Sequence, residues 1–233
     1  DLRRDLGKLQ ISAFKWAAPG IDAKHRVDSD DPEECMFLMD PSFVTPTFWV
    51  LAPVFGYLDW MLDQDMEAPY SSYRELLQHL YAQDPVGRRL VLKAPSHTSF
   101  VDELLRQFPD MMVVQTHRNP VKVTGSVNSL FATLHSAVCD DPDLPRMARS
   151  NLHMLQRLAD DNLAARDHLD EGRILDVHFE DLVADPIGTV RLIHHAYDLE
   201  LSDTDVRRLE VYLERRPRHR FGKHVYRAED FGL

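Results

Sequence analysis

Two short apolar runs in the middle of the chain are each followed at once by polar residues. Residues 90–92 lead into Lys93-Ala-Pro-Ser-His97, and residues 112–115 lead into Thr116-His-Arg118-Asn-Pro120. Short apolar runs next to turn residues predict buried strands, and a helical pattern follows each run. In an open parallel sheet, ligands bind outside the carboxyl ends of the strands. We therefore predict a ligand site at the residues that follow these strands.

The same pattern predicts an α/β fold. Residues 98–108, between the two runs, have the apolar spacing of a short helix, and 174–179 predict a third strand. A helix that joins two parallel strands forms a βαβ unit, whose right-handed crossover places both strand ends on one edge of the sheet. We expect a three-layer α/β/α fold around a mostly parallel central sheet, with residues 1–233 in a single domain.

Helical spacing covers most of the remaining chain. It predicts an amphipathic, basic start that contains Leu2, Leu6 and Leu9, and further helices at 54–62, 70–80, from Pro120 onward, 146–170, 187–197 and 204–215. Many aromatic residues lie between 43 and 81. These aromatic side chains either pack the core or line an acceptor pocket.

The segment Asp31-Pro-Glu-Glu34 has the residues of a helix start, because Asp can cap, Pro suits the first turn and carboxylates match the helix dipole. Glu33 and Glu34 are then either ordinary first-turn residues, or one of them projects into the cleft as a base.

Composition and charge narrow the class of protein. The chain is 44% apolar and 28% charged, enough for a sizeable core, and its net charge of −11 argues against nucleic-acid binding and adhesion to an anionic membrane. Any anion must be held by a local basic cluster.

Cys35 and Cys139 match no metal spacing, so we expect free thiols and no bound metal. No apolar run approaches the length of a membrane span and no secretory signal opens the chain, so we expect a soluble, cytoplasmic protein.

A basic segment near the end of the acidic chain is the second candidate for anion binding. Residues 215–224 have the sequence RRPRHRFGKH. Such a segment is either a solvated loop or a second clamp on a multiply charged ligand.

Several of these motifs, in this order, resemble those of the sulfotransferase family, closest to its bacterial and carbohydrate-type branch. They are Lys93-x-x-x-His97, Thr116-His-Arg118-Asn-Pro120 with Ser126 eight residues after the arginine, and LDVHFEDL at 175–182; the segments 31–35 and 224–233 also match. The resemblance covers most of the chain. It implies a sulfotransferase fold of the P-loop-NTPase-like kind. The implied reaction moves a sulfuryl group from 3′-phosphoadenosine-5′-phosphosulfate (PAPS) to a hydroxyl or amine of a small-molecule, lipid or carbohydrate acceptor, without a metal.

The resemblance also implies roles for individual residues. Arg118 and Ser126 match the pair that holds the 3′-phosphate of the nucleotide, where a guanidinium fork and a hydroxyl reach one anion. Lys93 matches the lysine that offsets charge on the bridging oxygen. His97 matches a position from which a histidine takes the proton of the acceptor, with Glu33 or Glu34 as the alternative base.

Within the basic segment, Arg220, Gly222 and Lys223 stand where relatives use a basic, glycine-containing loop on the same phosphate. The spacing does not reproduce the Arg-Lys-Gly triplet of those relatives.

One family feature is missing from this sequence. Members begin with a strand and a Gly-, Ser- and Thr-rich turn that cradles the 5′-phosphosulfate, and no such turn occurs here. We expect that strand and turn upstream of Asp1, with the strand at the centre of the sheet.

The competing functions are a non-catalytic module that binds the product adenosine 3′,5′-bisphosphate (PAP) or another anion, and a nucleotide kinase, whose Gly-x-x-x-x-Gly-Lys-Ser/Thr motif is not visible.

Overall fold

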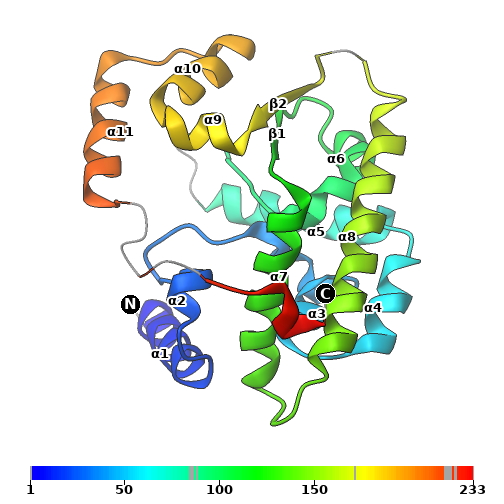
Figure 1. The fold of residues 1–233 in the computed structure, drawn as a ribbon. Helices are drawn as coiled ribbons and strands as arrows, with labels where there is room; N and C mark the ends of the chain where they lie inside the picture. The colour runs from blue at the N-terminus through cyan, green and yellow to red at the C-terminus, as the bar shows by residue number, and fades with distance from the viewer. Residues whose placement is uncertain are drawn as a thin grey trace.

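A computed structural model gives the fold, and it describes residues 2–83, 87, 89–170, 172–217, 222 and 225–232 (Figure 1). The helices are α1 (Leu2–Ala17), α2 (Ile21–Lys24), η1 (Cys35–Ser42), α3 (Thr47–Leu51), α4 (Phe55–Leu62), α5 (Glu67–Ala82), η2 (Pro95–Phe100), α6 (Val101–Gln107), α7 (Pro120–Ser136), α8 (Leu144–Arg166), α9 (Phe179–Ala184), α10 (Pro186–Ala196), α11 (Asp203–Arg215) and η3 (Ala228–Phe231). The strands are β1 (Val113–His117) and β2 (Ile174–His178).

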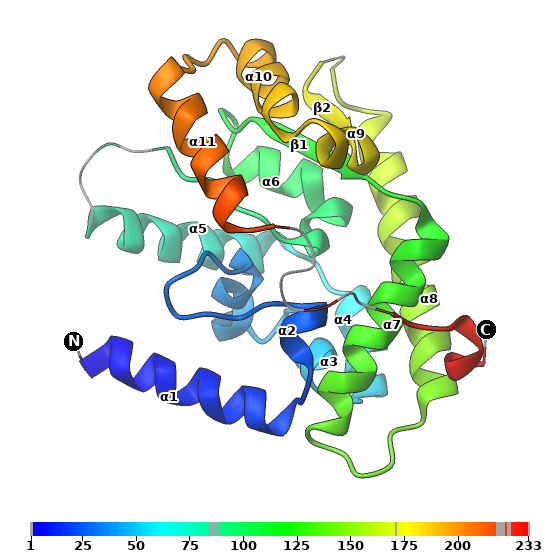
Figure 2. The same cartoon turned by 60° about the vertical axis from the view of Figure 1, so that its left-hand side comes forward.

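The two strands pair in parallel, with Val113 opposite Ile174 and His117 opposite His178. Figures 1 and 2 show the pair between α9 and α10 on one side and α6 on the other, with α8 alongside. Helices on both faces are the usual setting of a parallel sheet, whose strands are buried on both sides. The arrangement confirms the predicted α/β fold with a parallel sheet, and both strands lie within two residues of their predicted positions.

The strand predicted at 90–92 is wrong. These residues have no strand partner, and Val91 is 93% exposed. An apolar run of three residues becomes a strand only when a neighbouring strand takes up its backbone N–H and C=O groups, and none among the described residues lies beside it. The βαβ unit is therefore reduced to an extended segment, followed by η2, α6 and β1.

The first-turn position predicted for Glu33 and Glu34 is also wrong. The helix here is the 3₁₀ helix η1, which begins only at Cys35, and Glu34 precedes it with extended backbone angles (φ −64°, ψ 135°). The helices predicted from apolar spacing form within about four residues of their predicted bounds, whereas α2, α3, α9 and η3 were not predicted. In α7, the Asn119 side chain accepts hydrogen bonds from the N–H groups of Val121 and Lys122, and Pro120 occupies the first turn.

Two apolar clusters form most of the core. One contains Trp49, Leu58, Phe131 and Met147 and joins α3, α4, α7 and α8; the other surrounds Tyr70 and joins η1, α5 and α6. Much of the aromatic segment 43–81 is thus core packing. None of the helices within the described ranges is both long enough and apolar enough to cross a membrane.

Residues 225–232 pack across α7. The hydroxyl of Tyr226 donates to the carbonyl oxygen of Lys122 at 2.8 Å, and its ring lies so close to Gly125 that a Cβ there would collide with it. Phe231 is buried in the first apolar cluster, and Figure 2 shows this last segment beside α7 and α8. Residues 225–232 are therefore anchored at two points.

Candidate active site

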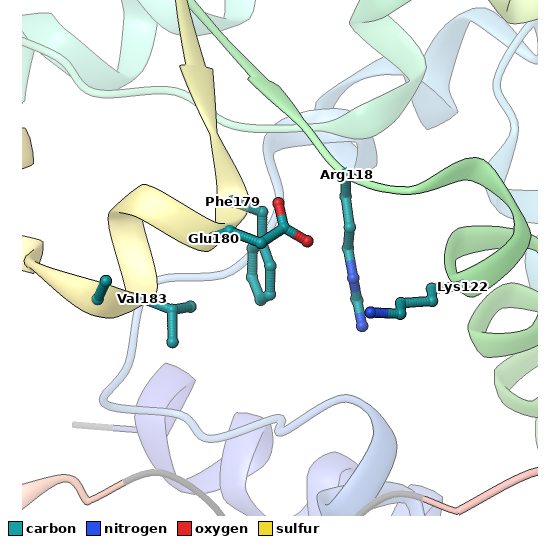
Figure 3. Close-up of a pocket in the computed structure, with 6 residues that line it drawn as sticks. Arg118, Lys122, Phe179, Glu180 and Val183 are labelled. Atoms are coloured by element: carbon teal, nitrogen blue, oxygen red, sulfur yellow. The ribbon is translucent and has the colours of Figure 1, made fainter.

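An open cavity of about 280 Å³ lies where β1 and β2 end (Figure 3). Arg118 follows β1, Lys122 lies on the first turn of α7, and Phe179 and Glu180 begin α9 directly after β2. Val183 and Ala184 of α9 also line the cavity. Both strands thus deliver side chains to one place, because parallel strands end at the same edge of a sheet.

Two cationic side chains meet at this cavity. The guanidinium of Arg118 lies 4.7 Å from the centre of the Phe179 ring, and Figure 3 shows the side chain of Lys122 pointing toward Arg118. Neither cation forms an ion pair with a carboxylate of the described residues, although Glu180 also lines the cavity. The lining therefore carries a net charge of about +1, which suits an anion.

Ser126 lies one helical turn beyond Lys122 and is half-buried. Ser126 does not line the cavity. Of the predicted pair Arg118 and Ser126, only Arg118 contacts the open space. The contact from Tyr226 is made on the same turn of α7, at the carbonyl of Lys122.

A second group of predicted residues lies around Lys93. Its ammonium forms an ion pair with the carboxylate of Glu34, which is only 16% exposed, whereas the lysine is 69% exposed. The N–H of Cys35 donates to the carbonyl of Lys93 at 3.0 Å and holds the two segments together. The structure thus brings Glu34 to Lys93.

Glu33 contacts His25 and not Lys93. One of its oxygens lies 3.0 Å from Nε2 of His25. Although burial opposes the shift, hydrogen bonds from His25 and from the backbone of Glu34 lower the pKa of Glu33, and the hydrogen bond to Glu33 raises the pKa of His25.

His97 is enclosed by protein partners on both ring nitrogens. Nδ1 lies 2.8 Å from the hydroxyl of Tyr70, and Nε2 lies 3.2 Å from Sγ of Cys35. Burial lowers the pKa of His97 to about 4, so the ring is neutral near pH 7. To accept a proton from a ligand, the ring would first have to give up one of these partners.

The predicted residues therefore fall into two groups. Glu34, Lys93 and His97 form one, Arg118 forms the other with Lys122, and no hydrogen bond or ion pair between described residues joins the groups.

Two of the predicted tail residues, Arg220 and Lys223, lie outside the described residues. Gly222 is described, exposed, and has a φ of 101° that favours glycine.

Sequence reasoning did not single out Lys122, Phe179, Tyr70 or the contact of Cys35 with His97. Lys122 had a signal, since it is a second basic residue close to Arg118 in the sequence, in the predicted first turn of the helix that begins at Pro120. The other contacts join residues far apart in the chain. Within the described part of the chain, no group of three or more His, Cys, Asp or Glu side chains could hold a metal ion.

The fold and the cavity define an α/β protein with a cavity, lined by two cations and one carboxylate, at the carboxyl ends of its parallel strands. The sequence matches the profile of the sulfotransferase family over residues 2–203, and the chain belongs to this family. It is 25% identical over 222 residues to the omega-hydroxy-beta-dihydromenaquinone-9 sulfotransferases Stf3 of Mycobacterium bovis and Mycobacterium tuberculosis, covering 85% of this chain and 55% of each relative.

Solved structures of similar proteins agree. Sulfotransferase STF9 from Mycobacterium avium superposes with a TM-score of 0.80 at 27% identity, over 96% of this chain and 59% of that one. Sulfotransferase STF1 from M. tuberculosis H37Rv gives 0.78 at 30% identity, over 97% and 58%. The chain thus spans little more than half the length of the relatives it matches.

Proposed function

We propose that this chain is the greater part of a PAPS-dependent sulfotransferase. Its acceptor is a hydroxyl or amine of a small molecule, lipid or carbohydrate. The observation that carries the proposal is the cavity in which Arg118 and Lys122 meet, at the position where the family motif predicts the 3′-phosphate site. Its volume of about 280 Å³ suits a phosphate and part of a ribose, since pockets for whole drug-sized ligands run from about 300 to 1,000 Å³.

The proposed roles follow from the chemistry of sulfuryl transfer. Like phosphoryl transfer, it requires in-line positioning and positive charge near the moving group. Lys93 supplies a point charge that offsets negative charge on the bridging oxygen as that bond breaks. Arg118 holds the 3′-phosphate with its fork of donors. Ser126 stands at the family position for the same anion, but its side chain does not line the cavity in this structure.

We assign the proton acceptor to Glu34 in preference to His97. The Glu34 carboxylate lies beside Lys93, close to the proposed path of the sulfuryl group, whereas both ring nitrogens of His97 are enclosed by protein partners. Glu33 is occupied by His25.

The acceptor class is proposed from the relatives. The two Stf3 proteins are named for omega-hydroxy-beta-dihydromenaquinone-9, so a lipid-like molecule with a hydroxyl group is the first acceptor class to test. A non-catalytic module that binds PAP is the second candidate, because the chain contains no Gly-, Ser- and Thr-rich phosphosulfate turn.

The test uses the longest natural form of the protein in which this chain occurs. We expect PAP binding by calorimetry and transfer of labelled sulfate from PAPS to a hydroxylated acceptor. Arg118→Ala should weaken PAP binding by about 1.5 to 3 kcal/mol, the scale of a charged hydrogen bond. Arg191→Ala, at an exposed arginine of α10, is the matched control and should change the affinity little.

Turnover separates the remaining alternatives. Glu34→Gln should retain PAP affinity and lose most of the transfer rate, while His97→Ala should lose less. The opposite order would give the base role to His97. PAP binding without transfer to any of a broad set of acceptors would favour the binding module, and absence of PAP binding would refute the proposal.

A further inference from the structure

We propose that Lys122 is a binding residue that makes the cavity selective for a phosphate dianion on the ribose. This inference rests on the proposed function and assigns a role to a side chain outside the family motif described above. Its basis is the charge balance of the cavity, the backbone contacts that hold Lys122, and the direction of its side chain.

The charge balance makes Lys122 decisive. Arg118 and Glu180 line the same cavity, and Figure 3 shows the carboxylate of Glu180 facing the arginine. Their opposite charges largely cancel for an anion that enters between them. Lys122 is the second cation of the lining and leaves it with a net charge of about +1. Without Lys122, the cavity would be close to neutral.

The backbone at the start of α7 does not replace this charge. The first amides of a helix often bind anions, but here the side-chain oxygen of Asn119 already accepts from the N–H groups of Val121 and Lys122, at 3.0 and 3.3 Å. Side chains must therefore supply most of the attraction for an anion in this cavity.

Lys122 is also held on both sides of its backbone. Asn119 binds its N–H, and the hydroxyl of Tyr226 donates to its carbonyl oxygen at 2.8 Å. A lysine on a fixed backbone directs its ammonium more precisely than one on a free loop, because only its side-chain torsions remain to be ordered.

The direction of the side chain points to a ligand. The ammonium of Lys122 points toward Arg118 in Figure 3, and it forms no ion pair within the described residues. By contrast, Lys93 pairs with Glu34 and Lys15 pairs with Asp22. Two adjacent like charges repel each other, and an anion between them removes that cost.

The chemistry fits a phosphomonoester. Such a group carries between about −1.5 and −2 charges at pH 7. An arginine offers a planar fork of donors for two oxygens of the phosphate group, and a lysine adds a point charge for the third phosphate oxygen. A nucleotide with a 3′-phosphate should therefore gain from Lys122, and a nucleotide without one should not.

The experiment measures the affinity of the same full-length protein for PAP and for adenosine 5′-monophosphate by calorimetry. Lys122→Met keeps the length of the side chain and removes its charge. We expect it to weaken PAP binding about tenfold, the lower range for a charged hydrogen bond, and to change binding of the 5′-monophosphate less than about twofold. Lys8→Met removes the same charge from an exposed site on α1 and should leave both affinities unchanged.

Removal of the negative charge across the cavity makes the test stricter. Glu180→Gln should strengthen PAP binding, and adding it to Lys122→Met should recover most of the lost affinity, because the double variant restores a net charge of about +1. Lys122→Arg should bind PAP within about threefold of the wild type, since the charge is kept.

The outcomes separate this inference from the proposed function. If the wild type binds PAP and Arg118→Ala weakens it while Lys122→Met does not, Lys122 has no role and the proposed function stands. An equal loss for both nucleotides with Lys122→Met would also overturn the assignment to the 3′-phosphate. If the wild type does not bind PAP, both proposals are refuted.

Discussion

His97 lies in an environment that keeps its imidazole neutral at physiological pH. The ring is enclosed by Tyr70, Tyr73 and Cys35, and its pKa of about 4 results from burial. A motif can place a histidine after a strand, but the pKa of the ring depends on which side chains surround it. The protonation state of His97 is therefore decided by neighbours that lie 27 and 62 residues away in the sequence.

This depressed pKa predicts acid sensitivity. His97 titrates near 4 when folded and near 6.5 when unfolded, so between these values the unfolded state binds more protons. The stability due to His97 is thus complete above pH 6.5 and decreases as the pH falls towards 4, by about 3 kcal/mol over the full window. Urea denaturation at several pH values should show a smaller loss for His97→Gln than for the wild type.

The comparison between the two proteins isolates the contribution of His97. His135, whose pKa is also lowered by burial, is present in both and contributes equally. Identical pH dependence in wild type and variant would mean that His97 is not desolvated in the folded protein.

At the scale of elements, helices were predictable and the first strand was not. Helix α7 has a cap, a proline in the first turn and an apolar stripe within its own sequence. Residues 90–92 have apolar side chains but no neighbour of strand form, and strand pairing is a property of two segments. The extended Glu34 depends in the same way on contacts made by Lys93.

The contact between α7 and Tyr226 predicts that Gly125→Ala has opposite effects on the free energy of unfolding in the presence and in the absence of the tyrosine ring. Gly125→Ala should destabilise the wild type by about 1 to 3 kcal/mol, because the new Cβ would collide with the ring of Tyr226. In a Tyr226→Ala background the same change should stabilise by about 1 kcal/mol, the helix preference of alanine over glycine. Chemical denaturation of the four proteins measures both values.

Gly7→Ala is the control for helix preference. Gly7 lies within α1, and a Cβ there would meet no atom within 4 Å, so the change should stabilise by up to about 1 kcal/mol. If Gly125→Ala stabilised the wild type as well, Tyr226 would not be packed on α7.

At the scale of the whole molecule, a buried polar chain joins three helices of the core. The indole N–H of Trp49 donates to Oδ1 of Asn151, whose amide N–H donates to Oδ1 of Asn128, both at 2.9 Å. Nε2 of His135 lies 2.8 Å from the carbonyl of Trp49. These hydrogen bonds link α3, α7 and α8, and α7 in turn carries Lys122, while Nδ2 of Asn128 and Nδ1 of His135 remain without a partner among the described residues.

Asn151→Ala should therefore be strongly destabilising. It removes a partner from Trp49 and another from Asn128 while both remain buried, which costs about 1 to 3 kcal/mol for each group. We expect a loss of about 3 kcal/mol in the free energy of unfolding by urea denaturation. Gln156→Ala, at an exposed position of α8, should stay within about 0.5 kcal/mol of the wild type. A similar small effect for Asn151→Ala would show that the polar chain does not stabilise the core.

The sequence by itself determined the longer helices, the two paired strands and the order of the motifs that indicated the family, because periodicity, caps and short motifs are properties of neighbouring residues. Only the tertiary structure decided that Glu34 rather than Glu33 meets Lys93, that His97 is neutral, and that Lys122 joins Arg118 at the cavity. These outcomes depend on how helices and strands pack, and that packing sets the distances, burial and charge on which the chemistry of a site depends.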